Sequence, residues 1–178
     1  MKSDTNIQDK INNFLAENKI VLQGGEITSE KQLSLVLNDL AKGDLEKGKI
    51  EKALYFAEKA IEFYEGNFYS YFIKGLIYRQ LKKTKEAIES FEVYCKNSSD
   101  PLAYIYIGLS YAELNDVENA LDNLRMGEKN ISAGDSIFRC LNSSWRRLPG
   151  YALRQRLPLH KPAKHSRPRR GWKRIDDD

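Results

Sequence analysis

Small residues recur along the chain at intervals of 33 or 34 residues, and this repetition constrains the fold more than any other feature of the sequence. One series places a small residue in each unit, and a second series places an alanine twelve residues later. The first series is Ala41, Gly75 and Gly108, and the second is Ala53, Ala87 and Ala120. Tyrosines keep the same phase, since Tyr71 and Tyr104 precede the two glycines by four residues.

Between about residues 28 and 130, apolar residues recur every three or four positions, as they do in amphipathic helices. Two antiparallel helices approach closely only where both present small side chains, and larger neighbours then fill the layer beside that contact. We therefore predict an all-α chain. Residues 28–131 would form three helical hairpins, at about 34–67, 68–100 and 101–131. A short helix within residues 1–27, closed by a turn at Gly24-Gly25, would precede them.

The period and the pattern resemble the tetratricopeptide repeat (TPR), and the resemblance covers more than half of the chain. It implies a solenoid of three stacked hairpins whose first helices line a concave groove suited to a peptide. By analogy with the TPR, this lining is expected at the second, fifth, ninth and twelfth positions of each unit. Those positions hold Leu35, Asn38, Lys42, Leu45, Tyr69, Phe72, Leu76, Arg79, Leu102, Ile105, Leu109 and Ala112.

The expected groove is mostly apolar and aromatic in the second and third units. TPR grooves that hold the terminal carboxylate of a peptide are lined by Lys, Arg and Asn, and here only Asn38, Lys42 and Arg79 offer that chemistry. The lining therefore favours an apolar ligand. An alternative stays open, in which some of these residues belong to the core or face a neighbouring protomer.

Three stretches carry a closer resemblance. They are Phe14-Leu15 followed by Gly24-Gly25, Gly48-Lys49-Ile50-Glu51-Lys52-Ala53 with Phe56, and the run from Ile61 to Tyr71 that leads into Gly75-Leu76. The short second repeat, which ends at Asp100-Pro101, also fits. These stretches resemble the TPR chaperones of bacterial type III secretion, the class that holds translocator subunits. The resemblance implies that the groove binds a hydrophobic segment of a secreted protein before export. It also implies a homodimer formed through the N-terminal helix, by Ile7, Ile11, Phe14 and Leu15.

This sequence departs from that chaperone pattern in two places. Asp44 stands where the pattern has an aromatic residue, and no fourth, C-terminal helix is recognisable after Asn130. The departures concern the first wall of the groove and the C-terminal cap of the solenoid.

Charge is divided unevenly along the chain. Residues 1–130 hold 17 Lys and Arg against 21 Asp and Glu, a net charge of −4, whereas residues 131–178 hold 12 against 4, a net charge of +8. The tail at 132–178 is rich in Arg and Pro and is expected to be mostly irregular. Three interpretations stay open: a solvated disordered tail, a contact with nucleic acid or an acidic membrane, and a segment translated in a changed reading frame.

Several function classes fit the sequence poorly. No apolar run approaches the roughly 18 residues that span a bilayer, and the polar N-terminus lacks a signal-peptide core, so we expect a cytoplasmic bacterial protein without membrane insertion. Residues 1–130 contain no histidine, and Cys95 has no evident base near it, so we predict no enzyme and no metal or cofactor site. The alternatives to the secretion chaperone are a general TPR scaffold in another complex and, less favoured, a nucleic-acid contact through the tail.

Overall fold

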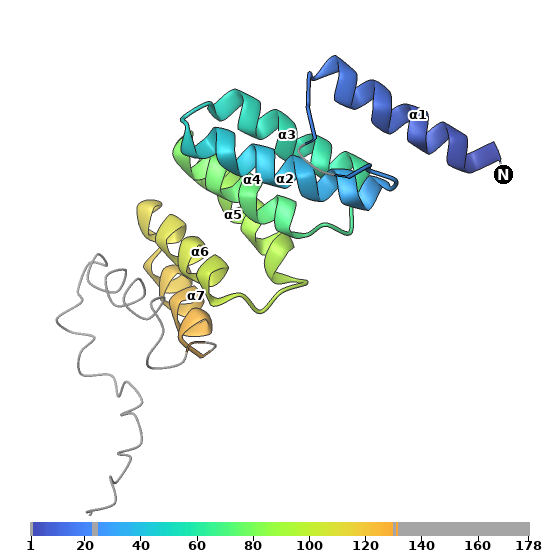
Figure 1. Ribbon diagram of the computed structural model, residues 1–178. Helices are drawn as coiled ribbons and strands as arrows, with labels where there is room; N and C mark the ends of the chain where they lie inside the picture. The colour runs from blue at the N-terminus through green and yellow to red at the C-terminus, as the bar shows by residue number, and fades with distance from the viewer. Residues whose placement is uncertain (1, 23–24, 130, 132–178) are drawn as a thin grey trace, which may run out of the picture.

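The computed structural model describes residues 2–22, 25–129 and 131, and these residues form seven α-helices and no strand (Figure 1). The helices are α1 (Lys2–Glu17), α2 (Glu30–Glu46), α3 (Ile50–Phe63), α4 (Tyr69–Gln80), α5 (Thr84–Cys95), α6 (Pro101–Glu113) and α7 (Val117–Lys129). The predicted all-α class is confirmed. The expectations for the tail at 132–178 lie outside the described residues.

Consecutive helices pair into three hairpins, α2 with α3, α4 with α5 and α6 with α7. The hairpins stack in chain order, because α3 also packs against α4 and α5 against α6. The first helices of the first two hairpins, α2 and α4, are in direct contact as well. The predicted solenoid of three helical hairpins, preceded by a short N-terminal helix, is therefore confirmed (Figure 1).

Small residues mark the closest approach within each hairpin. A Cβ added to Gly75 would lie 2.6 Å from the Phe91 ring, and one added to Gly108 would lie 2.8 Å from Cγ of Leu124 and 3.0 Å from the carbonyl oxygen of Ala120. Phe91 and Leu124 both follow their glycine by sixteen residues. Each glycine thus makes room for a large side chain on the second helix, and Gly108 also makes the predicted contact with the alanine of its unit.

The first hairpin meets the same packing requirement with different side chains. Ala41 is larger than glycine, and the residue sixteen positions later is Ala57 instead of Phe or Leu. Ala41, Ala53 and Ala57 have no exposed surface. In the first hairpin, small side chains therefore face each other from both helices, whereas the second and third hairpins pair a glycine with a large side chain.

The helix starts differ in how they are capped. Ser29 caps α2 by accepting a hydrogen bond from the Gln32 amide at 3.3 Å, and Asp100 caps α6 by accepting one from the Leu102 amide at 2.9 Å. Helices α3 and α5 instead begin after Lys49 and Lys83, neither of which forms a side-chain cap. Capping is worth roughly 0.5–2 kcal/mol, so α3 and α5 depend more on their packing.

Helix α1 packs on the first hairpin at one end of the stack (Figure 1). Ile11 has no exposed surface, and Phe14 is 8% exposed. The Phe14 ring lies 5.0 Å from that of Phe63 in an edge-on contact, and the Lys10 ammonium lies 2.9 Å from a carboxylate oxygen of Glu30. An open depression of about 420 Å³ separates parts of α1 and α3, so the helix covers the hairpin incompletely.

Candidate partner-binding surface

The first helices of the three hairpins form one continuous side of the stack, which we call the first-helix face. Helix α2 lies against α4. Helix α4 is tied to α6 by Arg79, whose Nη2 lies 3.3 Å from Oε1 of Glu113 and whose guanidinium carbon lies 5.0 Å from the centre of the Tyr106 ring. All twelve predicted groove residues come from these three helices.

The twelve residues differ in their access to solvent. Leu35 and Tyr69, at the second position of their units, are 51% and 43% exposed. Lys42 is also exposed. Leu45, Leu76, Arg79, Leu102, Leu109 and Ala112 are partly exposed. The structure therefore brings nine of the predicted residues to the surface, on an area that is apolar at most positions.

The fifth position of each unit lies inside the protein. Asn38, Phe72 and Ile105 are 3%, 5% and 1% exposed. Phe72 shows the reason, because its ring packs 6.0 Å from the Tyr106 ring of the next unit, at the contact between α4 and α6. Ile105 instead packs against Ala120 and Leu124 of its own hairpin. None of the three buried residues presents its side chain to an incoming ligand in this structure.

An aromatic cluster supports the exposed Tyr69. The Tyr69 ring stacks on Phe72 at 5.7 Å and meets Tyr94 of α5 edge-on at 6.3 Å. Phe91 stacks on Tyr106 at 5.5 Å and completes the cluster behind Phe72. Packed rings restrict the rotation of Tyr69, so its exposed edge is a rigid apolar contact. Sequence reasoning missed Tyr94 and Tyr106, although Tyr106 lies one helical turn after Leu102.

Of the basic and amide side chains on this face, Arg79 is paired with other residues, Asn38 is buried and Lys42 is exposed. Arg79 is held by Glu113 and Tyr106, and Thr84 also contacts Glu113, at 3.4 Å. The side-chain amide of Asn38 is buried and has no hydrogen-bond partner among the described residues. An unpaired buried amide costs roughly 1–3 kcal/mol. The structure thus does not assemble Asn38, Lys42 and Arg79 into an open site for a terminal carboxylate.

The residues expected at a dimer contact have a role within the chain. Ile11 and Phe14 are buried against the first hairpin, and Ile7 and Leu15 are partly buried beside them. Phe14 also stacks on Tyr55 at 6.5 Å. Dimerisation through this helix stays a prediction, and it requires α1 to leave this contact or to exchange it with a second copy.

Cys95 lies half-buried at the end of α5. Burial, with smaller contributions from the Asp100 and Glu92 carboxylates, raises the pKa of the Cys95 thiol to about 11. The thiol is therefore protonated at neutral pH, whereas nucleophilic cysteines need a depressed pKa. Burial likewise raises the pKa of Tyr94, whose hydroxyl donates to Oδ2 of Asp100 at 3.2 Å.

The described residues contain no group of three His, Cys, Asp or Glu side chains placed to hold a metal ion. None of the seven helices combines the length and the apolar character that crossing a membrane requires. What these residues do offer is the first-helix face, an exposed apolar surface on a rigid scaffold.

Comparison with known proteins agrees with this geometry. Residues 69–100, which form the second hairpin, match the tetratricopeptide repeat family model. Two TPR repeat-containing proteins of Methanocaldococcus jannaschii are 30% identical over 95 residues and 33% identical over 69 residues. These matches span 53% and 38% of this chain but only 30% and 20% of the relatives' own lengths.

Solved structures extend the likeness to all three hairpins. The first TPR domain of Spaghetti (RPAP3), bound to an HSP90 peptide, superposes with a TM-score of 0.58 at 21% identity over 68% of this chain and 95% of that one. The fold is TPR-like. The Yersinia enterocolitica type III secretion chaperone SycD, in complex with a peptide of the translocator YopD, superposes with a TM-score of 0.63 at 15% identity, over 74% and 99%. At such identities the TPR likeness concerns the fold alone.

Proposed function

We propose that this TPR-like chain is a binding module that takes an apolar segment of another polypeptide on its first-helix face. The exposure of Leu35 and Tyr69 on helices whose other faces are buried is the observation that supports this most strongly. An exposed leucine alone is ordinary, but these two occupy the same repeat position and Leu102, at that position in the third unit, is partly exposed as well. The proposal needs no catalytic step.

We further propose that the partner is a hydrophobic translocator subunit of bacterial type III secretion, held in the cytoplasm before export. Two observations support this more specific role. The sequence resembles those chaperones in three stretches, and the fold superposes on nearly the whole of SycD, a chaperone solved with a translocator peptide. A translocator must later enter a membrane, so its apolar segments need cover in water.

The energetics suit such a role. Covering apolar surface is worth roughly 25 cal/mol per Å², so each 100 Å² of Leu35, Tyr69 and their neighbours that a ligand covers contributes about 2.5 kcal/mol before the costs of association. The aromatic packing behind Tyr69 already fixes its rotamer. Less ordering entropy is therefore lost on the module's side of the complex.

The experiment is co-expression with the product of the adjacent gene, followed by co-purification and titration calorimetry with the wild type and two variants. Tyr69→Ala removes an aromatic ring from the first-helix face, where Tyr69 is 43% exposed. Met126→Ala is the matched control, because Met126 is 42% exposed but lies on α7, a second helix. We expect Tyr69→Ala to weaken binding about tenfold or more, the effect of losing an aromatic anchor, and Met126→Ala to leave it unchanged.

Two results would contradict the proposal at different levels. Equal affinity in the wild type and Tyr69→Ala would remove the first-helix face as the binding surface. Binding that depends on Tyr69 but involves a partner without long apolar segments would leave the face in place and replace the chaperone by a general TPR scaffold. The RPAP3 domain, solved with an HSP90 peptide, is a scaffold of TPR-like fold that supports this second candidate.

A further inference from the structure

Lysines gather at the turns of the first two hairpins. The turn between α2 and α3 carries Lys47 and Lys49, and the turn between α4 and α5 leads through Lys82 and Lys83 to Lys85. All five are exposed. The ion pairs within the described part of the chain use other side chains, so none of these five charges is neutralised by a contact there. We call these five residues the lysine edge.

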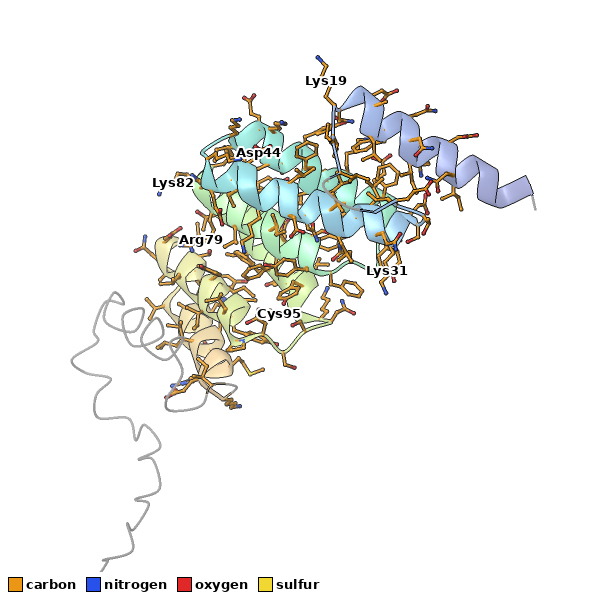
Figure 2. The ribbon with its side chains drawn as sticks, viewed as in Figure 1. Lys19, Lys31, Asp44, Arg79, Lys82 and Cys95 are labelled. Carbon is orange, nitrogen blue, oxygen red and sulfur yellow. The ribbon has the colours of Figure 1, made fainter. Side chains whose placement is uncertain are left out.

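Both turns lie on the same side of the stack, where α2 and α4 end. Figure 2 shows Asp44, near the end of α2, on the same side as Lys82, whereas Lys31, near the start of α2, lies on the opposite side. The third hairpin joins them, because Arg79 of α4 and Thr84 of α5 both contact Glu113 at the end of α6. The turns of all three hairpins therefore form one border of the molecule.

Charge changes sign along this border. Residues 42–52 and 79–86 together carry eight basic and four acidic side chains, a net charge of +4. Residues 113–119, at the third turn, carry Glu113, Asp116 and Glu118 and no basic side chain. Since residues 1–130 have a net charge of −4, the part of this body outside the two basic segments has a net charge of −8. Positive charge is thus concentrated on two neighbouring turns of an otherwise acidic body.

We propose that the lysine edge is a second contact surface, which binds a short acidic segment of the partner polypeptide. The inference rests on the proposed function in one respect, namely that the partner is a protein chain. Packed helices lie about 8–10 Å apart, and an extended chain advances about 3.3 Å per residue, so three or four residues bridge adjacent helices. Carboxylates at that spacing would meet lysines from both turns.

The third turn favours a short segment over a long polyanion. A nucleic acid that follows the border would bring its phosphates against Glu113, Asp116 and Glu118, and like charges at close range repel. A short peptide segment ends before that turn. The lysine edge adds electrostatic steering, orientation and a modest affinity to an apolar contact on the first-helix face, since each exposed charge pair contributes little and several together contribute more.

The test uses the full chain and a dye-labelled peptide of about twelve residues that alternates Glu and Ser, followed by fluorescence anisotropy. The edge variant combines Lys82→Glu, Lys83→Glu and Lys85→Glu. Lys85 lies in the first turn of α5, where a carboxylate suits the helix dipole, and Lys82 and Lys83 are exposed in the turn before it, so this variant is expected to fold. The matched control combines Lys19→Glu, Lys96→Glu and Lys129→Glu, which are also exposed and without an ion pair but lie elsewhere.

The control has the same net charge as the edge variant, so it isolates position from total charge. We expect the edge variant to lose about tenfold in peptide affinity, because it loses three modest surface charge contacts. The control should lose about twofold at most. The wild-type affinity should fall as salt is raised. Carbodiimide cross-linking of the peptide should modify Lys82, Lys83 or Lys85 in the wild type.

Several results would overturn the assignment. Equal losses in the two variants would show an effect of bulk charge, and cross-links confined to residues beyond 131 would place the peptide on the basic tail. Loss of RNA binding in the edge variant without loss of peptide binding would make the surface a nucleic-acid site. If the edge variant changed the sedimentation coefficient of the protein without changing its peptide affinity, the lysine edge would be a contact with a second copy of this chain. Tyr69→Ala should leave the peptide affinity unaltered, so this proposal and the proposed function fail separately.

Discussion

Gly75 lies where α4 and α5 approach most closely, and its replacement by alanine tests how the hairpins are held together. The added Cβ would lie 2.6 Å from the Phe91 ring. That ring has no room to withdraw, because Phe91 is fully buried and packs against Phe72 and Tyr106 at 5.6 and 5.5 Å between ring centres. Overpacking a core costs roughly 1–3 kcal/mol, and alanine returns at most about 1 kcal/mol in helix propensity.

We therefore expect Gly75→Ala to lower the free energy of unfolding by about 1–2 kcal/mol. Gly43→Ala is the matched control, because Gly43 also lies inside a helix but a Cβ there would meet nothing within 4 Å. The control should gain about 0.5–1 kcal/mol from helix propensity alone. The same substitution thus has opposite signs at the two positions.

Urea unfolding followed by circular dichroism measures both effects, and a melting curve should separate the variants by several degrees, since about 1 kcal/mol shifts Tm by roughly 2–4 °C in a chain of 150–250 residues and by more in a smaller domain. A double-mutant cycle with Phe91→Ala removes the clashing ring. In that background Gly75→Ala should stabilise the protein. Equal stability of Gly75→Ala and the wild type, or the same sign at both glycines, would refute the packing account.

Three further predictions concern single contacts. Ser34→Ala should lower the free energy of unfolding by roughly 1–3 kcal/mol, because the buried Ser34 hydroxyl donates to the Ala60 carbonyl at 2.7 Å and accepts from the Asn67 amide at 2.8 Å; urea unfolding checks this, and an unchanged midpoint would contradict it. Asp100→Ala should lower the free energy of unfolding by about 0.5–2 kcal/mol, because α6 loses its N-terminal cap. Asp100→Asn should keep most of the stabilisation that the cap provides. Alkylation of Cys95, followed by mass spectrometry, should accelerate with pH up to about 11, because the raised pKa keeps the thiol protonated below that value; a rate at pH 8 equal to that of free cysteine would contradict the burial of this thiol.

The repeat architecture was predictable because the contacts that define it recur in phase. Gly75 and Gly108 are spaced like the alanines that follow them, and close helix packing is one of the few reasons for such a series. The helix boundary at Asp100-Pro101 could also be predicted from the sequence, because an acidic cap and a proline at the first helical position are local signals. Helix starts at Lys49 and Lys83 carry no such signal.

The exposure of the candidate surface was harder to predict. Counting positions along one helix placed Asn38, Phe72 and Ile105 beside Leu35 and Tyr69, but the first three are buried, Phe72 against the next hairpin and Ile105 against α7 of its own hairpin. That outcome depends on how far successive units rotate, a quantity that the spacing of residues within one unit does not contain.

The packing of α1 shows a second kind of limit. Its apolar residues share one helical face, which indicates that something must cover this face. The pattern does not indicate which part of the protein or which partner covers it. A dimer partner and the chain's own first hairpin satisfy the same sequence pattern. In the structure, contacts of Phe14 with Phe63 and of Lys10 with Glu30 give the covering role to the chain itself.

Hydroxyl-radical footprinting of the complex with the co-expressed partner tests the central claim most directly, because it reports the solvent access of single side chains. Leu35 and Tyr69 are 51% and 43% exposed in the free protein, and Tyr55 and Met126, on second helices, are 40% and 42% exposed. We predict that the partner protects Leu35 and Tyr69 from oxidation and leaves Tyr55 and Met126 as reactive as before. Protection of Tyr55 and Met126, with Leu35 and Tyr69 still reactive, would contradict binding at the first-helix face.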